Sequence, residues 1–238
     1  MTEPEWLTGN DPVALMCGLQ GFNISYRKQQ LFNCAVARAV CNPWPDPVCE
    51  KHIELVERQL DQHPVDEAEC DRVKDEVGEL ARASAIPAQE AFEESGQWTP
   101  SVLDQLRRSI GITTTDMVLG SMEWWYWLSD LEYTSTLSAF DAVWGSMLID
   151  NYRACLPLLR CIVGNPFRPV TFDPAWRSET AVALATGIYA DHAFDRLPIL
   201  ADALEEAGCD HPEVLAHCRG PGPHARGCWV ADGVLTKS

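Results

Sequence analysis

The sequence predicts an all-α protein, built as a multi-helix bundle with a small helical C-terminal module after a proline-rich extended segment. Three observations support this prediction. Apolar residues recur every three or four positions in most segments, as on one face of a helix. Capping residues followed by proline mark several helix starts. No segment alternates apolar and polar residues for more than a few positions, so any sheet is marginal.

The first helices begin at recognisable caps. Thr2 and Glu5 have the spacing of a capping box, and Asp11 precedes a proline, which predicts two short helices. Ser25 can cap a longer helix that ends near Val40, before a proline-containing segment at residues 42–45. The N-terminal part is therefore expected to be helical throughout.

The next helices continue the bundle. Asp46 and Pro47 repeat the start signal, and an apolar stripe follows. The stripe comprises Val48, Cys49, His52, Ile53, Val56 and Leu60. Residues 64–85 form a charged amphipathic pattern whose carboxylates are expected on a solvated face. A helix at residues 100–108 and two long helices at about 115–130 and 136–162 complete the predicted bundle.

The C-terminal module is predicted to begin where the composition changes. Residues 165–176 are rich in proline, so we expect a division into a bundle at residues 1–163 and a module at residues 164–238. One continuous domain is the alternative. Helices are expected at residues 179–189, at 196–207 with Asp195 as N-cap, from Pro212 to His217, and after Gly227.

Charge and composition exclude some classes of function. The 238-residue chain has a net charge of −17 and a sequence pI near 4.6, so its field repels nucleic acid and anionic membranes. No apolar run approaches the roughly 20 residues that span a bilayer, and residues 1–6 do not resemble a signal peptide. The ten cysteines are therefore expected as reduced thiols in a cytoplasmic protein.

Four consecutive aromatic residues occupy the centre of the chain. On a helix, Trp124, Trp125, Tyr126 and Trp127 point in all directions and cannot all enter one core. Packing between several helices is one interpretation, and a surface for a partner or ligand is the other. A ligand-binding bundle would place an apolar cavity beside Trp124 and Trp144.

A cluster of cysteine and histidine near the C-terminus is the best candidate site. Cys209, Cys218, His224 and Cys228 have a spacing similar to that of CCCH zinc fingers with the last two ligand types exchanged. Zinc accepts thiolate and imidazole in either order, and His211 and His217 are alternative ligands. Three interpretations stay open: a structural zinc site, a catalytic or redox cysteine, and buried thiols beside surface histidines.

One further constellation could support acid/base chemistry. His192 lies in sequence beside Asp191 and close to Asp195, and a carboxylate can orient an imidazole and raise its pKa. Asp195 is also explained as an N-cap. The sequence contains no nucleophile elbow, phosphate-binding glycine loop, dinucleotide fingerprint or H-E-x-x-H motif, so no reaction is indicated.

Three segments of the tail carry a family resemblance. They read NPFRPVTFDPAW at residues 165–176, AFDRLPILADALEEAGC at 193–209 and HCRGPGPHARGCWVADGVL at 217–235. The tail resembles that of a bacterial, largely planctomycete, protein family with no assigned reaction, cofactor or substrate, which is also similar at residues 1–7 and 26–38. The resemblance implies no catalytic residue.

These observations predict a cytoplasmic helical protein that acts by binding another protein or by self-association, with the central aromatic residues as the contact. A zinc-dependent enzyme or regulator that uses the C-terminal Cys/His cluster is the first alternative. A helical bundle that binds a small ligand is the second. No nucleic acid or membrane is expected as a partner.

Overall fold

The computed structural model describes residues 1–120 and 139–237, with side chains for residues 1–116 and 142–237. The structure is 73% helical, and its described part contains twelve α-helices, two short 3-10 helices and no strand. This confirms the all-α prediction. None of the described helices is long and apolar enough to cross a membrane.

The chain forms two compact units, which are described separately. Unit 1 comprises residues 1–9, 19–32 and 156–238, and unit 2 comprises residues 10–18 and 33–155. The predicted module at residues 164–238 lies wholly within unit 1. The chain therefore passes back and forth between the units, and α3 (Tyr26–Cys41) contributes residues to both.

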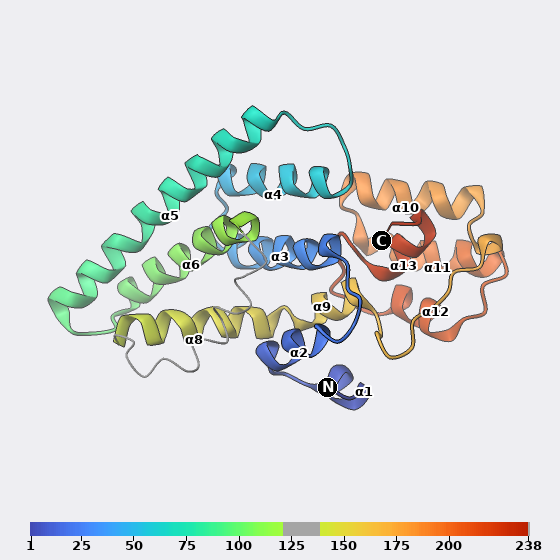
Figure 1. Cartoon of the computed structure of the whole chain (residues 1–238), viewed down its shortest axis with the longest axis horizontal. Helices are drawn as coiled ribbons and strands as arrows, with labels where there is room; N and C mark the ends of the chain where they lie inside the picture. The colour runs from blue at the N-terminus through green and yellow to red at the C-terminus, as the bar shows by residue number, and fades with distance from the viewer. Residues whose placement is uncertain (121–138, 238) are drawn as a thin grey trace. The chain divides into compact units, whose positions relative to one another are not determined.

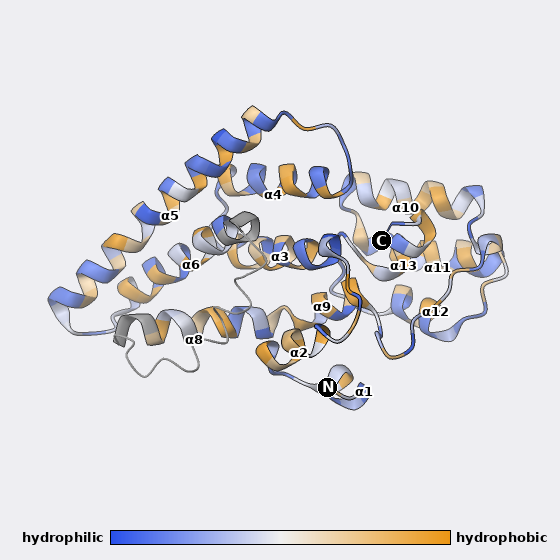
Figure 2. Cartoon of the chain, viewed as in Figure 1, coloured by the Kyte–Doolittle hydropathy of each residue, from blue (hydrophilic) through white to orange (hydrophobic). Residues whose placement is uncertain are grey.

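Unit 2 contains the long helices of the bundle. They are the second part of α3, α4 (Pro47–Leu60), α5 (Glu67–Ser95), α6 (Pro100–Gly120) and α8 (Ala139–Ala154), and the short helix α2 (Pro12–Leu19) lies largely in the same unit. Helices α5 and α6 run side by side (Figure 1). Apolar residues recur along one side of α4 and α5 (Figure 2), as the predicted stripes require.

Unit 1 contains shorter helices around its own apolar cluster. They are α1 (Glu3–Thr8), the first part of α3, α9 (Leu156–Val163), α10 (Glu179–Asp191), α11 (Leu197–Glu206), α12 (Pro212–Arg219) and α13 (Trp229–Leu235). The 3-10 helices η1 (Pro174–Trp176) and η2 (Phe194–Arg196) lie between them. Helix α10 packs on α11 and α13, and α11 packs on α12.

The predicted helix starts agree with the structure at several caps. Both hydrogen bonds of the Thr2 capping box are present. Asp11 Oδ1 accepts from the Ala14 amide at 3.1 Å, and Asp46 Oδ1 accepts from the Val48 amide at 2.9 Å. These bonds satisfy amide groups that a helix leaves unpaired in its first turn, which explains why local sequence places these starts.

The prediction that Asp195 is the N-cap of the helix after it is wrong. It lies within η2 and makes no capping hydrogen bond, and α11 begins at Leu197 with a proline in its first turn. The 3-10 turn leads the chain directly into α11, so the helix needs no side-chain cap at this position.

Several helix ends also differ from expectation. Helix α5 continues through Pro87 to Ser95, because α6 packs along it and buries Ala88 completely. Helix α6 does not break at Gly111, where an added Cβ would lie 3.3 Å from Cys41 Sγ. The glycine thus allows α6 to approach α3 closely.

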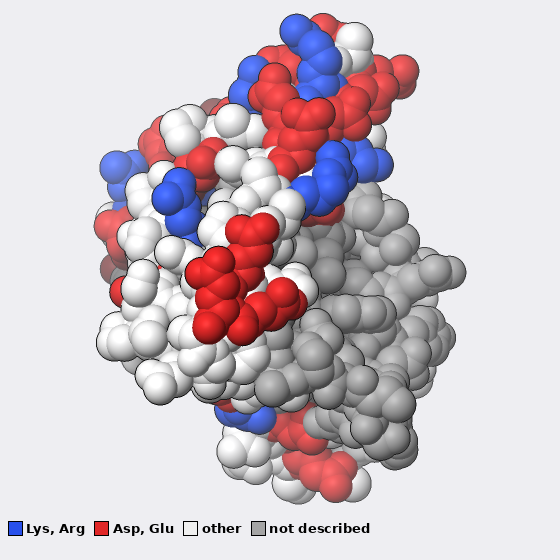
Figure 3. Space-filling model, turned by 90° about the vertical axis from the view of Figure 1, so that its left-hand side faces the viewer, with Lys and Arg blue, Asp and Glu red and all other residues white. Residues whose placement is uncertain are grey.

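Carboxylates dominate parts of the surface, as the net charge predicts. On the face drawn in Figure 3, acidic side chains gather in a central patch, and acidic and basic side chains are interspersed above it. On α5 the exposed acidic residues include Asp71, Asp75, Glu76 and Glu79. The charged side of α5 is therefore a solvated face, as expected.

His52 in α4 predicts a pH dependence of stability. Its side chain is buried, and burial, with the positive charge of Lys74, lowers its pKa from 6.5 to about 4. The unfolded chain therefore takes up the proton first as the pH falls. We expect His52 to reduce the free energy of unfolding progressively between pH 6.5 and 4, by about 3 kcal/mol at pH 4.

This expectation is checked by urea unfolding at several pH values with the variants His52→Leu and His63→Gln. The His52→Leu chain should lose this part of the pH dependence. His63 is exposed, so its variant should follow the original chain. Parallel pH profiles for the original chain and His52→Leu would contradict the expectation.

Candidate metal centre

Four cysteine and histidine side chains converge in unit 1. They are Cys161 on α9, His217 in the last turn of α12, His224 in the loop between α12 and α13, and Cys228 at the N-cap of α13. Their ligand atoms all lie within 4.8 Å of one another. Both cysteines are buried, and both histidines are half-buried.

The distances within the group fit a tetrahedral ion. Cys161 Sγ lies 3.7 Å from His217 Nε2 and 3.5 Å from His224 Nδ1, and Cys228 Sγ lies 3.2 Å from His217 Nε2. With Zn–S near 2.3 Å and Zn–N near 2.0–2.1 Å, a tetrahedral site has sulfur and nitrogen ligands about 3.5 Å apart. These three distances are therefore close to those between the ligands of one zinc ion, and the other three lie within 4.8 Å.

The electrostatics of the group centre on Cys228. Burial raises the pKa of its thiol, but hydrogen bonds from Cys161, His217 and His224 outweigh burial and hold that pKa well below its ordinary value. The same thiolate, through its hydrogen bond, raises the pKa of His224 against the effect of burial. The hydrogen bond to Cys228, together with burial, raises the pKa of the Cys161 thiol well above its ordinary value. One thiolate is thus favoured before any cation is considered.

A buried polar network fixes the loop that carries Cys228. Arg27 on α3 pairs with Asp232 on α13 at 2.7 Å, and the Tyr189 hydroxyl on α10 donates to the same carboxylate. The hydroxyl also accepts from the Gly227 amide at 2.9 Å. Asp232 is 1% exposed, so the bonds from Arg27 and Tyr189 replace water that its carboxylate has lost. The network therefore connects three helices to the residue before Cys228.

Gly227 itself is required by the geometry of the loop. Its φ of +90° lies in the region that favours glycine, and an added Cβ would lie 2.9 Å from Leu31 Cδ1. We expect Gly227→Ala to lower the free energy of unfolding of unit 1 by about 1–3 kcal/mol through backbone strain, with the clash adding to this.

Urea unfolding checks this expectation, with Gly187→Ala as the matched control. Gly187 lies within α10, and an added Cβ there meets no atom within 4 Å. The control should be neutral or stabilising, because alanine favours a helix interior over glycine. Equal stability of the two variants would show that Gly227 carries no special constraint.

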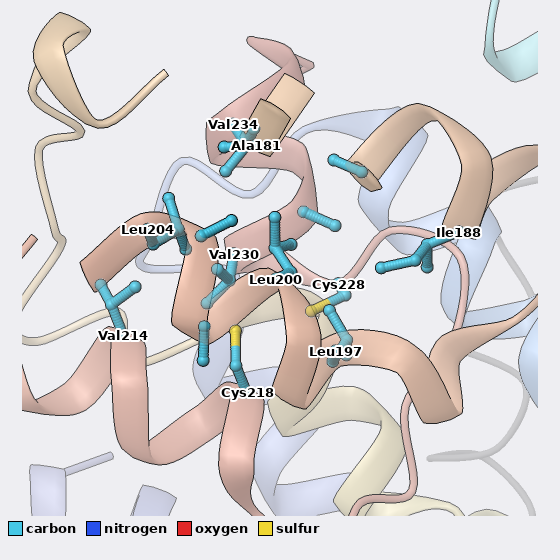
Figure 4. Close-up of a cluster of buried hydrophobic side chains, with 14 of the residues drawn as sticks. Ala181, Ile188, Leu197, Leu200, Leu204, Val214, Cys218, Cys228, Val230 and Val234 are labelled. Carbon is cyan, nitrogen blue, oxygen red and sulfur yellow. The ribbon is translucent and has the colours of Figure 1, made fainter. Parts of the chain in front are cut away.

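The structure brings together half of the predicted ligand set. His224 and Cys228 belong to the group, and so does the alternative ligand His217. Cys209 and Cys218 lie in the hydrophobic cluster of unit 1, where Figure 4 shows Cys218 among aliphatic side chains. The His211 ring packs edge-on near Trp176 at 6.4 Å and is outside the group.

Cys161 is the member of the group that the sequence pattern missed. It precedes His217 by 56 residues, and the pattern placed it among the apolar residues of a long helix. The structure divides that helix, because α8 ends at Ala154 and α9 begins at Leu156 with a proline in its first turn. The only local signal was a cysteine in the last turn before Gly164.

Other sequence candidates have different outcomes. Trp124, Trp125, Tyr126 and Trp127 lie outside the described residues, so the cavity expected beside Trp124 and Trp144 stays a prediction. Asp191 pairs with Arg196 at 3.5 Å on the surface, and His192 forms the left-handed C-cap of α10 with its ring near Phe194. These contacts give His192 and Asp191 structural roles.

Comparison with known proteins gives no match from which the function of the site could be inferred. No protein-family model, curated protein or solved structure matches this chain. The arrangement of Cys161, His217, His224 and Cys228 is therefore the main observation that bears on function.

Proposed function

We propose that unit 1 is a zinc-binding module in which one Zn²⁺ is held by Cys161 Sγ, His217 Nε2, His224 Nδ1 and Cys228 Sγ. The observation that carries this proposal is the mutual spacing of the four ligand atoms, all within 4.8 Å. Two thiolates and two imidazoles are a common tetrahedral zinc set, and zinc is favoured over harder ions such as Mg²⁺ and Ca²⁺, which prefer oxygen.

The proposed ion has a structural role. Four protein ligands fill a tetrahedral site and leave no position for water or substrate, whereas catalytic zinc sites keep one position open. The ligands come from α9, α12, α13 and the loop between the last two, so a single ion would tie together segments distant in sequence. The module is thus proposed as a zinc-stabilised scaffold.

Metal analysis of the purified protein tests the proposal. About one zinc per chain is expected, and Cys161→Ser and His217→Asn should each lose most of it. Cys209→Ala and Cys218→Ala are matched controls, since both cysteines are buried in unit 1 outside the group. They should retain zinc, which also separates this ligand set from the set that the sequence spacing predicts.

Cobalt substitution gives a second measurement on the unmodified chain. Replacing zinc by Co²⁺ should give the intense visible absorption of a tetrahedral site together with sulfur-to-cobalt charge transfer. A protein that contains no stoichiometric metal and gives no such spectrum with Co²⁺ overturns the proposal. Loss of zinc from the Cys209 and Cys218 variants, with retention in Cys161→Ser, would overturn the ligand assignment.

A further inference from the structure

A pocket of about 500 Å³ lies in unit 1, separate from the four metal-binding side chains. Its volume falls in the range of roughly 300–1,000 Å³ that is typical of small-molecule sites. Its walls include Phe22, Val163, Phe172 and Trp229, which come from four different segments of the chain. Lys28, on the first turn of α3, also lines it. Most of the lining can thus contact an apolar ligand, with a cation among the lining groups.

The charge balance of the pocket differs from that of the whole chain. Lys28, Arg168 and Lys237 line it together with the carboxylates Glu213 and Asp232, although the chain as a whole has a net charge of −17. Arg27 and Tyr189 already bind the Asp232 carboxylate, and Glu3 pairs with Arg168 at 2.8 Å, so the cation of this lining on which the proposal rests is Lys28. The local field of the pocket therefore favours an anion.

Lys28 has hydrogen-bonding capacity that a ligand can use. Its ammonium donates to the Ile162 carbonyl at 2.8 Å, the one hydrogen bond it makes within the described residues. An ammonium carries three donors. Burial lowers the pKa of Lys28 against the attraction of Asp232, as expected for a cation that has lost part of its surrounding water. A ligand carboxylate would supply the missing acceptor.

We propose that this pocket binds a small organic carboxylate with an apolar body, with the carboxylate on Lys28 and the body against Phe172, Val163 and Trp229. Inorganic phosphate fits the geometry less well, because the aromatic and aliphatic walls would leave it without partners. The proposal does not depend on the zinc site. It concerns a different set of side chains, although Trp229 follows Cys228 and its ring packs 5.4 Å from that of His217.

Calorimetric titration of the full chain tests this proposal with hexanoate, octanoate and decanoate, each compared with its alcohol. The three carboxylates should bind, and affinity should rise about fourfold for each buried CH₂ until the pocket is full. The alcohols should bind at least tenfold more weakly, because they cannot make a charge-assisted hydrogen bond with Lys28.

Two substitutions of Lys28 separate its charge from its packing. Lys28→Met should weaken carboxylate binding by about 10- to 100-fold and leave alcohol binding unchanged, whereas Lys28→Arg should retain most of the affinity. Lys51→Met is the matched control, since Lys51 is an exposed lysine of α4 in unit 2 that pairs with Glu69. Circular dichroism and urea unfolding confirm that each variant is folded.

The outcomes are distinguishable from those of the metal experiment. If none of the three carboxylates binds, or if carboxylate and alcohol bind equally, the pocket proposal is overturned. Unchanged carboxylate affinity in Lys28→Met also overturns it. Loss of zinc affects neither comparison, because each variant is titrated at a known metal content and each ligand pair shares one protein sample.

Discussion

Removing the proposed zinc ion with a chelator should lower the melting temperature of the protein by about 10 °C. A ligand present at about 1,000 times its dissociation constant contributes about 4 kcal/mol to stability, and each kcal/mol corresponds to about 2–4 °C in a protein of this size. Without the ion, the side chains of Cys161, Cys228 and the two histidines would lose the metal bonds that connect their segments. Scanning calorimetry before and after chelation measures the shift.

Two controls accompany the chelation experiment. Adding Zn²⁺ back should restore the original melting temperature, whereas Mg²⁺ should not, because it prefers oxygen ligands. The Cys161→Ser variant should already melt at the lower temperature and respond little to the chelator. An unchanged melting temperature in the chelated original chain would contradict both the stabilising role and the metal centre.

Removing the buried carboxylate of Asp232 should strongly destabilise unit 1. Asp232→Ala leaves the guanidinium of Arg27 in a largely buried position without its partner, and loss of one partner of a buried ion pair costs about 3–5 kcal/mol. It also releases the Tyr189 hydroxyl that binds the Gly227 amide. We therefore expect weaker zinc binding as well as a lower free energy of unfolding.

Urea unfolding and a zinc competition assay measure these two effects. The matched control is Asp202→Ala, which removes an exposed carboxylate 2.9 Å from Arg219 and should cost less than about 1 kcal/mol. A double variant, Arg27→Met with Asp232→Leu, should recover part of the stability, because it leaves neither charge unpaired. Equal stability of Asp232→Ala and Asp202→Ala would show that the buried network contributes little.

The sequence predicted correctly those features that depend on residues close to one another along the chain. The caps at Thr2, Asp11 and Asp46 follow from hydrogen bonds within one helical turn, so the residues themselves contain the information. Continuation of α5 through Pro87 and of α6 through Gly111 depends on packing between helices. A sequence pattern records such contacts only indirectly.

The candidate site was predictable only in its local part. His224 and Cys228 are four residues apart, and His217 is close to both, so spacing alone brought them into consideration. Cys161 joins them because α9 packs beside α13, and no local signal encodes that contact. Cys209 and Cys218 have suitable spacing, but Cys209 follows the end of α11 and Cys218 lies within α12, and neither thiol joins the group.

The division of α3 between the two units has a consequence for the order in which the chain folds. Unit 2 is complete once residue 155 has been synthesised, whereas unit 1 needs residues 1–9 and 19–32 together with residues 156–238. During translation, Arg27 and Lys28 therefore cannot form their hydrogen bonds to Asp232 and Ile162 until about 200 and 130 further residues, respectively, have been synthesised. Ion capture at Cys228 would come near the end of this sequence, as the step that closes a unit whose first helices were made long before.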